Sequence, residues 1–381
     1  MKKIFLAAIA MSLVAVTNAQ INNGWNLITG YESSVSAGET NKNAGNYSLI
    51  GGGQFNTNSG GWSIIGGGSG NVSSGDTSVI GGGLANHITG LSSFVGGGEG
   101  NHVTLPNGAA ASSIVGGFDN TVTAEASAIV GGYGNSIDSG SSFIGAGDQN
   151  DIDVHGIYSV IGGGSQNYIQ TNYSVISGGQ YNVSDGGYYG VIGGGYKNTN
   201  SAAFGVIGGG DFNRATGSFS TVPGGVQAFA RSYGQVAHAS GSFDFVNGGL
   251  GEAQASEYIL RITTTTTNDT ELFLDGDAAT QRVLIPSDGT WTFEVQVTAR
   301  NATGGSAGFK ADGVIQTVSG TTSLNGVAGG QLSATSIYQV LPGLGVTVLA
   351  DDTHDALAIK VHGASSTNRW VATVRTTEVR Y

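Results

Sequence analysis

A nine-residue phrase recurs along this 381-residue chain at nearly constant spacing, and it limits the possible folds more than any other feature. The phrase reads Ser-apolar-apolar-Gly-Gly-Gly-x-x-Asn, and Ser48 to Asn56 is a complete copy. The copies begin at residues 33, 48, 63, 78, 93, 113, 128, 142, 159, 174, 190, 205 and 220, those at Ser113 and Ala128 being one residue shorter. Eight of the twelve intervals are 15 residues, which is typical of a repeat architecture.

The length and chemistry of the repeat predict a parallel β-solenoid. Fifteen residues are too few for a helical hairpin or a propeller blade, and the apolar pair is β-branched. We expect each coil to hold one strand at the apolar pair, as in Val79-Ile80, and a second strand after the Asn, as at Ile88. Corner glycines permit close stacking of backbones, and a row of Asn can hydrogen-bond successive turns. The predicted fold is all-β, with about thirteen coils.

The two apolar positions of the phrase also predict self-assembly. The third position is Val or Ile in all thirteen copies, and the second is apolar in eleven. Because neighbouring residues of a strand point to opposite faces, only one of these rows can fill the thin interior. The other row forms a long apolar stripe, and stripes of that size mark interfaces. We expect a closed homo-oligomer; the alternative is a monomer whose own insertions cover the stripe.

The ends of the chain and its composition restrict location and partners. Residues 1–19 combine Lys2 and Lys3, an apolar stretch and a small-residue cleavage site, which predicts a signal peptide followed by a lead-in over 20–32. No later apolar run is long enough to span a membrane. The formal net charge of -12 disfavours nucleic acid as a partner, and the absence of Cys excludes thiolate chemistry. We expect a secreted or cell-surface protein without a cofactor.

A change in composition near Gly251 predicts two domains, a repeat domain over 33–250 and a C-terminal domain over 251–381. Glycine falls from 54 of the 230 residues in 21–250 to 14 of the 131 residues that follow. Alternating apolar runs predict strands in the second domain at residues 258–264, 271–274, 282–285, 290–299, 345–350, 356–361 and 369–379. Strands in this number favour a compact antiparallel β-sandwich.

Two resemblances follow from these motifs. Over residues 33–250, the Ser-Val-Ile-Gly phrase with small residues at its turns resembles the head of trimeric autotransporter adhesins. That resemblance implies a left-handed parallel β-roll that trimerises along its length. Over about residues 230–381, segments such as 234–241, 257–264 and 369–372 are similar to the C-terminal part of bacteriophage tail-fibre proteins. In those proteins comparable roll repeats lead into a terminal β-domain.

Aromatic residues immediately before the phrase are candidate ligand-binding residues. Five successive coils carry them, at Tyr158, Tyr173, Tyr189, Phe204 and Phe219. Their rings would form a ladder that stacks on sugar rings. Stacked aromatics also stabilise parallel β structure without a ligand, so packing is the alternative interpretation.

Acidic residues form a second candidate site. Asp148, Asp151 and Asp153 lie in Gly- and Asn-rich turns that resemble calcium-binding repeat loops, and solvated turn acids are the alternative. Asp351, Asp352, His354 and Asp355 form a weaker metal candidate. Neighbouring coils would also place Asp138 near Asp153, although glycan hydrolysis needs a specific carboxylate spacing.

Together these features predict an exported, fibrous, adhesin-like or tail-fibre-like protein that is not an enzyme. A rigid trimeric β-roll would present a C-terminal domain for attachment to a glycan or cell surface. One alternative is a structural filament or matrix protein without a specific receptor. Another is a tailspike-like polysaccharide depolymerase.

Overall fold

The computed structural model describes residues 25–105, 111–244, 249–277 and 280–381. It divides into two compact units, Met1–Tyr181 and Asn182–Tyr381. The predicted signal peptide, residues 1–19, lies outside the described residues. The predicted boundary near Gly251 falls inside the second unit and stays a prediction. In the described part of the chain, no helix is long and apolar enough to cross a membrane.

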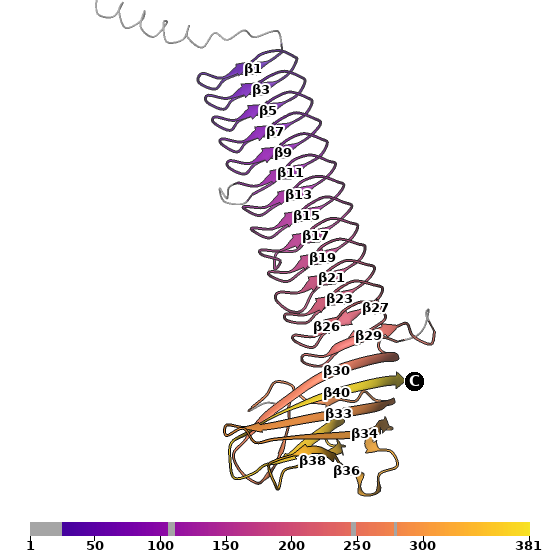
Figure 1. The fold of residues 1–381 in the computed structure, drawn as a ribbon. Helices are drawn as coiled ribbons and strands as arrows, with labels where there is room; N and C mark the ends of the chain where they lie inside the picture. Colours follow the sequence, from indigo (N-terminus) through magenta and orange to yellow (C-terminus); the bar gives the residue numbers. More distant parts are fainter. Residues whose placement is uncertain (1–24, 106–110, 245–248, 278–279) are drawn as a thin grey trace, which may run out of the picture. The chain divides into compact units, whose positions relative to one another are not determined.

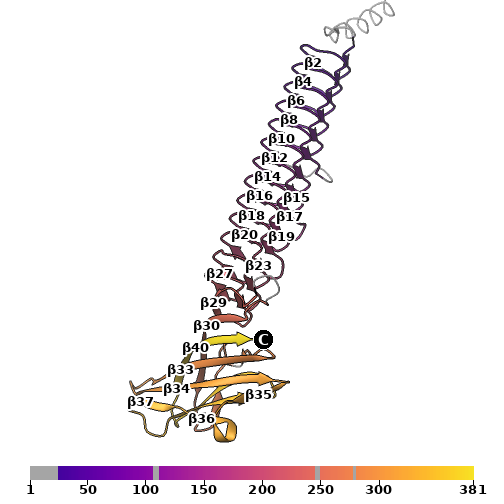
Figure 2. The same ribbon diagram turned by 90° about the vertical axis from the view of Figure 1, so that its right-hand side faces the viewer.

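The first unit is a parallel β-solenoid built from very short strands (Figure 1). One row of strands, seen in Figure 2, occupies the apolar pair of each turn and is paired in parallel, for example Ile64 with Val79 and Ile65 with Ile80. This row contains β2 (Ser34–Val35), β4 (Leu49–Ile50), β6 (Ile64–Ile65), β8 (Val79–Ile80), β10 (Phe94–Val95), β12 (Ser113–Ile114), β14 (Ala128–Ile129), β16 (Phe143–Ile144), β18 (Val160–Ile161) and β20 (Val175–Ile176).

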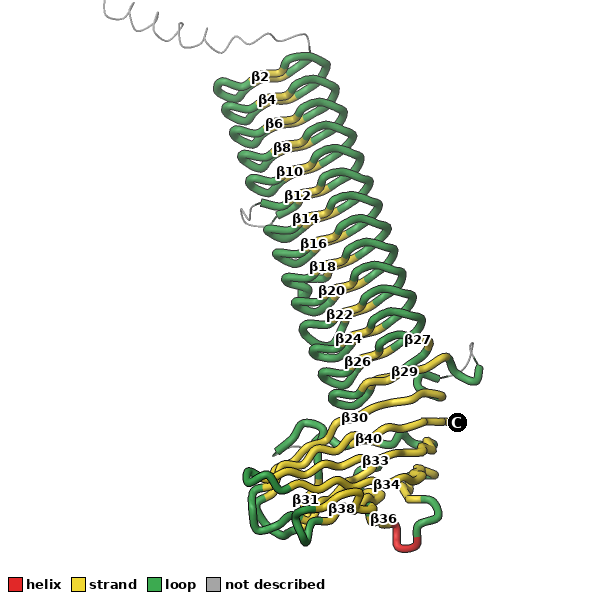
Figure 3. The backbone as a smooth tube through the Cα atoms, in the orientation of Figure 1, coloured by secondary structure: helices red, strands yellow, loops and turns green. Residues whose placement is uncertain are grey.

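A second row of strands follows the Asn of each turn, as predicted. It contains β1 (Leu27–Ile28), β3 (Lys42–Asn43), β5 (Thr57–Asn58), β7 (Val72–Ser73), β9 (His87–Ile88), β11 (His102–Val103), β13 (Thr121–Val122), β15 (Ser136–Ile137), β17 (Asp151–Ile152) and β19 (Tyr168–Ile169). β1 already pairs in parallel with β3, so a solenoid turn lies within the predicted lead-in. Single bridges such as Gln54 to Ser69 add a third row between the two. Loops and turns make up the rest of each coil (Figure 3).

Interior positions of these turns are filled mainly by aliphatic side chains. Ile65, Ile80 and Ile88 are fully buried, whereas the preceding residue of the first row is partly exposed, as at Ile64. Some turns place Asn43, Asn58 or Ser73 in the interior instead. Asn43 satisfies this burial by donating through Nδ2 to the carbonyls of Ser34 and Ser48. The prediction that one aliphatic column is buried and its neighbour faces outward is confirmed within the turns.

Two copies of the phrase have a different register from the predicted one. Ile114 and Ile129 are fully buried, while Val115 and Val130 are 54% and 46% exposed. The copies therefore begin at Ser112 and Ser127 and are of full length. In both copies a Val occupies the position of the first glycine. An alignment that places the apolar pair directly before the glycines therefore starts each copy one residue too late.

Asparagine ladders connect successive turns at one corner. Asn71 is fully buried, and its Nδ2 donates to Asn56 Oδ1, to the carbonyl of Gly67 and to the carbonyl of Gly83, each at 3.0 Å. Its Oδ1 accepts from the backbone N and the Nδ2 of Asn86. Every polar atom of the side chain is thus paired, which removes the cost of burying an amide.

A glycine is required next to this ladder. Gly53 has φ of +89°, and a Cβ at this position would clash with the carbonyl oxygen of Gly68 in the next turn. Only a residue without a Cβ allows the turns to approach this closely.

The second unit begins with further solenoid turns. Its first row contains β22 (Val191–Ile192), β24 (Val206–Ile207) and β26 (Thr221–Val222), and its second row contains β21 (Val183–Ser184), β23 (Thr199–Asn200), β25 (Arg214–Ala215) and β28 (Phe229–Ala230). The short strand β27 (Gly225–Val226) continues the third row, where Val226 bridges to Asp211. Counted from β1 to β28, the second row has fourteen strands along the chain, so there are about fourteen turns. β26 then pairs in parallel with β29 (Val236–Ser240), and β29 pairs antiparallel with β30.

The C-terminal region is an antiparallel two-sheet structure (Figure 1). The larger sheet contains β30 (Ala253–Thr264), β40 (Asn368–Arg380), β33 (Gly289–Asn301), β34 (Ser306–Val318), β35 (Thr321–Leu324) and β37 (Thr335–Gln339). The smaller contains β31 (Asp269–Glu271), β32 (Val283–Leu284), β39 (Ala356–His362), β38 (Gly345–Asp351) and β36 (Gln331–Ser333), and a single 3-10 turn spans Ala328–Gly330. Tyr258, Trp291 and Trp370 of the larger sheet share one core with Val348 and Ile359 of the smaller.

The predicted all-β fold, a parallel solenoid followed by an antiparallel sandwich, is confirmed. Six of the seven predicted C-terminal strands overlap observed strands, whereas the one predicted at 271–274 shares only Glu271 with β31. The strands β34, β35, β36 and β37 were not predicted. The longest of them is β34. Its alternation is interrupted by glycines, and Gly313 lies opposite Phe293 on β33. A Cβ at Gly313 would stand 2.5 Å from the Phe293 ring, so the glycine makes room for that ring.

Candidate functional site

Five aromatic residues, Tyr158, Tyr173, Tyr189, Phe204 and Phe219, form what we call the aromatic column. Each lies at a solenoid corner, at or next to the residue that begins the repeated phrase, with φ between 56° and 61°. Each is between 44% and 56% exposed. The rings therefore present substantial apolar area to solvent.

Neighbouring rings of the column stack within each unit. In the first unit, the Tyr158 and Tyr173 centroids are 5.2 Å apart with 13° between the planes. In the second unit, Phe204 lies 4.8 Å from Tyr189 and 4.9 Å from Phe219, with 12° and 2° between the planes. Each group offers a row of parallel ring edges at the spacing of the turns.

The turn itself does not demand an aromatic residue. Other turns place Thr77, Ser92 or Ser141 at the same corner with nearly the same positive φ. A bulky side chain at positive φ is unfavourable, because only glycine and small polar residues adopt this region readily. Exposed aromatic residues at these corners therefore reduce the stability of the fold, and stacking between the rings offsets only part of that loss.

Sequence reasoning missed a second set of exposed or partly exposed aromatics, in or next to the bridge row between the two strand rows. Phe118 and Tyr133 stack with centroids 5.4 Å apart in the first unit. In the second unit the Lys197 ammonium lies 5.1 Å and 5.3 Å from the Tyr196 and Phe212 ring centroids. The signal was available, because most of these residues follow the glycines of the phrase directly.

The three predicted calcium ligands do not share one row. Asp148 belongs to the bridge row, where its Oδ2 accepts from Ser165 Oγ at 3.3 Å. Asp151 begins β17, and Asp153 follows that strand and accepts from Tyr168 Oη at 2.8 Å. Within the described ranges, no group of three acidic, His or Cys side chains is arranged to hold a metal ion. Calcium binding at these residues stays a prediction.

Asp151 is nevertheless electrostatically unusual. Burial, together with the charges of Asp138 and Asp153, raises the pKa of Asp151 from 3.8 to about 6. Asp153 behaves oppositely, since the hydrogen bond from Tyr168 and those from His155 lower its pKa despite some burial. Asp138 accepts from Thr123 Oγ1 at 2.6 Å. The region therefore holds one carboxyl group that binds its proton tightly between two engaged carboxylates.

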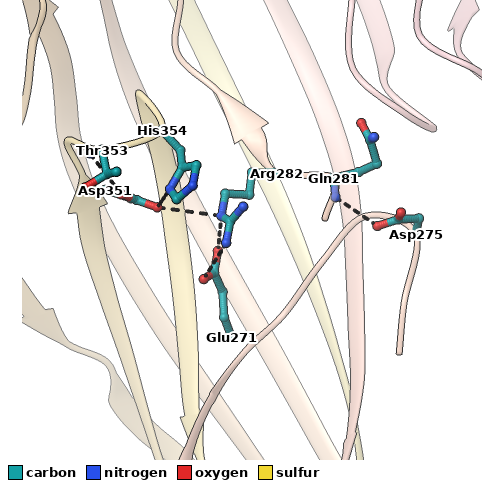
Figure 4. Close-up of polar contacts among 7 residues, drawn as sticks. All are labelled: Glu271, Asp275, Gln281, Arg282, Asp351, Thr353 and His354. Carbon is teal, nitrogen blue, oxygen red and sulfur yellow. Dashed lines mark hydrogen bonds and ion pairs between the residues drawn. The ribbon is translucent and has the colours of Figure 1, made fainter. Parts of the chain in front are cut away.

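The second predicted acidic cluster is a structural ion-pair network (Figure 4). Arg282 Nε lies 2.8 Å from Glu271 Oε1 and 3.6 Å from Asp351 Oδ2, and that oxygen also contacts His354 Nδ1 at 2.7 Å. Burial raises the pKa of Asp351, but the hydrogen bonds from His354 and Thr353 outweigh it and hold the pKa below its ordinary value. The network joins β31, the segment before β32 and the end of β38.

An exposed apolar column runs beside the buried one in the first row of strands. Its members include Ile64, Phe94 and Phe143 in the first unit and Val191 and Val206 in the second, each between 36% and 41% exposed. These residues alternate with fully buried neighbours such as Ile65 and Ile144.

Comparison with known proteins gives only distant likenesses. No protein-family model matches the chain, and no curated protein matches it. Among solved structures, the chain is similar to a tailspike protein of Acinetobacter baumannii bacteriophage Fri1, described as a capsular polysaccharide depolymerase, with 8% identity and a TM-score of 0.20. That match covers 91% of this chain and 79% of the other.

Two further tailspike proteins are similar to the same degree. The tailspike of Acinetobacter baumannii phage AM24 gives 10% identity and a TM-score of 0.21, covering 88% of this chain and 78% of the other. The tailspike of Acinetobacter phage vB_ApiP_P1 gives 10% identity and a TM-score of 0.19, covering 87% and 82%. Because the first of the three is a depolymerase and hence an enzyme, the prediction that this chain is not an enzyme is withdrawn. At these TM-scores the likeness assigns no reaction, substrate or site to this chain.

Proposed function

We propose that this chain is an exported attachment protein in which solenoid turns form a stiff spacer and exposed aromatic rings bind glycan. The observation that carries the proposal is the aromatic column, whose stacked rings stand half exposed at corners that other turns fill with Thr or Ser. The exposed ring edges form an apolar strip that suits the C–H groups of sugar rings, and a strip of several rings suits a polymer. Export is inferred from the character of residues 1–19.

The spacer role is supported by how the turns are joined. Each turn hydrogen-bonds its neighbours through backbone rows and through buried Asn side chains, with Asn-to-Asn distances of 3.0–3.2 Å in the first unit. Bending such a stack would break several of these bonds together, and the amides that lost them would stay buried.

We further propose that copies of the chain associate along the exposed apolar column, as a trimer by resemblance to autotransporter adhesin heads. Ile64 and Phe94 would then be covered by a second copy, which offsets the cost of presenting them to water. Sedimentation equilibrium of the full chain tests this assembly. A single folded polypeptide at micromolar concentration would contradict it.

A glycan array tests the attachment function. We expect the protein to bind a defined subset of sugars, and the triple variant Tyr189→Ser, Phe204→Ser, Phe219→Ser to lose at least about tenfold in affinity, as expected when stacking is removed. Serine is the residue that other turns carry at this corner, for example Ser92, so the turn is preserved.

The double variant Phe118→Ser, Tyr133→Ser is the matched control. It removes a stacked pair from the bridge row, where Ser69 and Ser165 already occur, and should leave binding unchanged. Binding to no sugar on the array would contradict attachment and favour a structural filament or matrix protein.

A further inference from the structure

Two arginines face each other on the solvent side of the larger C-terminal sheet. Arg300 of β33 is directly opposite Arg369 of β40, and both side chains are exposed. Like charges in directly opposed positions destabilise a sheet. The chain has only 14 Lys and Arg against 26 Asp and Glu, so an abundance of basic residues does not account for this pair. A gain in stability therefore does not explain why these two arginines lie opposite each other.

Two other basic residues on the same face are paired with carboxylates. Arg375 of β40 donates to Glu257 of β30 at 3.0 Å, and Lys310 Nζ of β34 lies 3.2 Å from Glu294 Oε1 of β33. No ion pair involves Arg300 or Arg369 among the residues that the structure describes. The N–H donors of both guanidinium groups are therefore available to hydrogen-bond a ligand.

These arginines line a cavity of about 370 Å³. The other lining residues are Asn301, Ala302 and Thr367, so the five described residues around the cavity include no carboxylate. Asn301 Oδ1 accepts from the backbone N of Thr303 and Gly305, which fixes the loop after β33. Its Nδ2 makes no hydrogen bond within the described part of the chain. The volume falls in the range of small-molecule sites.

A neighbouring cavity of about 180 Å³ shares Arg369 but differs in charge. It is also lined by Asp277, whose Oδ1 accepts from the backbone N of Thr263 at 2.7 Å. Arg261 at its edge donates to the carbonyls of Leu274 and Asp275. Because these two side chains are already hydrogen-bonded, the Arg300 side of Arg369 is the better place for an anion.

We propose that the pocket between Arg300 and Arg369 binds the carboxylate of an acidic saccharide unit, such as a uronate. Two guanidinium forks can hold one carboxylate through paired, charge-assisted hydrogen bonds, and the bound anion relieves the repulsion between them. Asn301 Nδ2 and the Thr367 hydroxyl can hydrogen-bond the sugar hydroxyls. A net charge of -12 repels dense polyanions at long range, so a saccharide with sparse carboxylates fits best.

This pocket is distinct from the aromatic column and does not depend on it. The test is titration of the full chain with methyl β-D-glucuronide and with methyl β-D-glucoside, followed by nuclear magnetic resonance of the Arg Nε–Hε signals. We expect the glucuronide to bind at least tenfold more tightly than the glucoside, which differs only in carrying a hydroxymethyl group in place of the carboxylate. Arg300→Gln and Arg369→Gln should each weaken glucuronide binding at least tenfold, and Arg369→Lys should weaken it less.

Arg375→Gln is the matched control, since it removes an arginine of the same strand and face that lies outside the pocket. It should leave glucuronide binding unchanged. Equal binding of glucoside and glucuronide would overturn the proposal, and so would undiminished binding in both Gln variants. Acetate or sulfate binding as tightly as the glucuronide would show that the pocket recognises charge alone, which overturns the assignment to a saccharide.

Thermal unfolding separates binding from structure. The two Gln variants should melt at or above the temperature of the parent protein, because the like-charge contact is gone. A marked decrease would show that the pair holds β33 and β40 together and would contradict the proposal. The triple Ser variant of the aromatic column should still bind the glucuronide. That result would show that the arginine pocket works without the aromatic column.

Discussion

The solenoid turns and the C-terminal sheets are both built from β-strands, yet they are stabilised in different ways. A solenoid turn has strands of two residues, and its Asn side chains bond within the turn and to the adjacent turns. The C-terminal region has strands of up to 13 residues around one core that includes Trp291 and Trp370. Damage should therefore stay local in the solenoid and spread through the whole C-terminal core.

The largest effect is expected for Trp370→Ala. Trp370 is 1% exposed, and its Nε1 donates to Thr264 Oγ1 at 2.9 Å. Truncation of a buried Trp costs about 3–5 kcal/mol, so the C-terminal transition in urea should move to much lower concentration while the solenoid transition stays in place. Val371→Ala is the control, because this neighbour is 46% exposed and should change stability by less than about 0.5 kcal/mol. Equal shifts of both transitions would break the contrast between the regions.

A smaller and more local effect is expected for Asn71→Ala. The change leaves the Gly67 carbonyl and the backbone N of Asn86 without a described partner, at a cost of about 2–3 kcal/mol. It also removes the side-chain bond to the Gly83 carbonyl, which still accepts from the backbone N of Ser69. Hydrogen exchange should accelerate in the turns around residues 56–86 and remain slow in distant turns. Asn46→Ala is the control, since Asn46 is exposed and its side chain accepts only one described bond, from the backbone N of Tyr31. Acceleration throughout the chain would show that the turns unfold as one unit.

Asp151→Asn should stabilise the solenoid at neutral pH. The fold raises the pKa of Asp151 from 3.8 to about 6, so the stability from its protonated form is complete below about pH 3.8 and is lost as pH rises through about 6. After allowance for its partial exposure, the Asn variant should be about 1 kcal/mol more stable at pH 7.5 and no more stable at pH 3.5. Thermal melts across this range measure the difference.

The control for this titration is Asp153→Asn, for which the opposite sign is expected. The pKa of Asp153 is lowered, so its stability contribution is present above pH 3.8 and is lost as pH falls through the folded-state value. The Asn variant should lose stability at pH 7.5. Parallel pH profiles for the two variants would contradict the electrostatic account.

The smallest effect is expected for Arg375→Gln. The pair with Glu257 lies on the exposed face of the sheet, so its loss should cost less than about 1 kcal/mol. The cost should shrink further in 1 M salt, as urea titrations at two salt concentrations would show. A cost as large as that of Trp370→Ala would mean that this face, and not the core, carries the stability of the sheet.

The repeat made most of the solenoid predictable, because one period fixes strand, corner and interior together. The predicted starts of the copies at Ser112 and Ser127 were wrong by one residue because the copies were aligned by their glycines. In these two copies Val115 and Val130 replace the first glycine. Alignment by Asn120 and Asn135 would have avoided this error, since the buried Asn ladder tolerates no shift. The interior Asn58 was also unforeseen, because nothing local distinguishes a buried amide from a corner one.

The placement of candidate residues was predictable only where it follows the repeat. The aromatic column has one residue per turn, so spacing alone places its members in a row within each unit. Arg300 and Arg369 are far apart in sequence, and their meeting depends on the pairing of β33 with β40. That register is set by packing of the whole core, which no local pattern of residues encodes.

The Asn ladder gives the solenoid a chemical direction. In the steps of the first unit the later Asn donates through its backbone N and Nδ2 to the Oδ1 of the earlier one, from Asn41 onto Asn26 and from Asn56 onto Asn41. A polypeptide that emerges with its N-terminus first thus completes each acceptor before the matching donor is synthesised. Each completed turn therefore presents acceptors for the turn that follows it, so the solenoid can grow turn by turn from its N-terminal end.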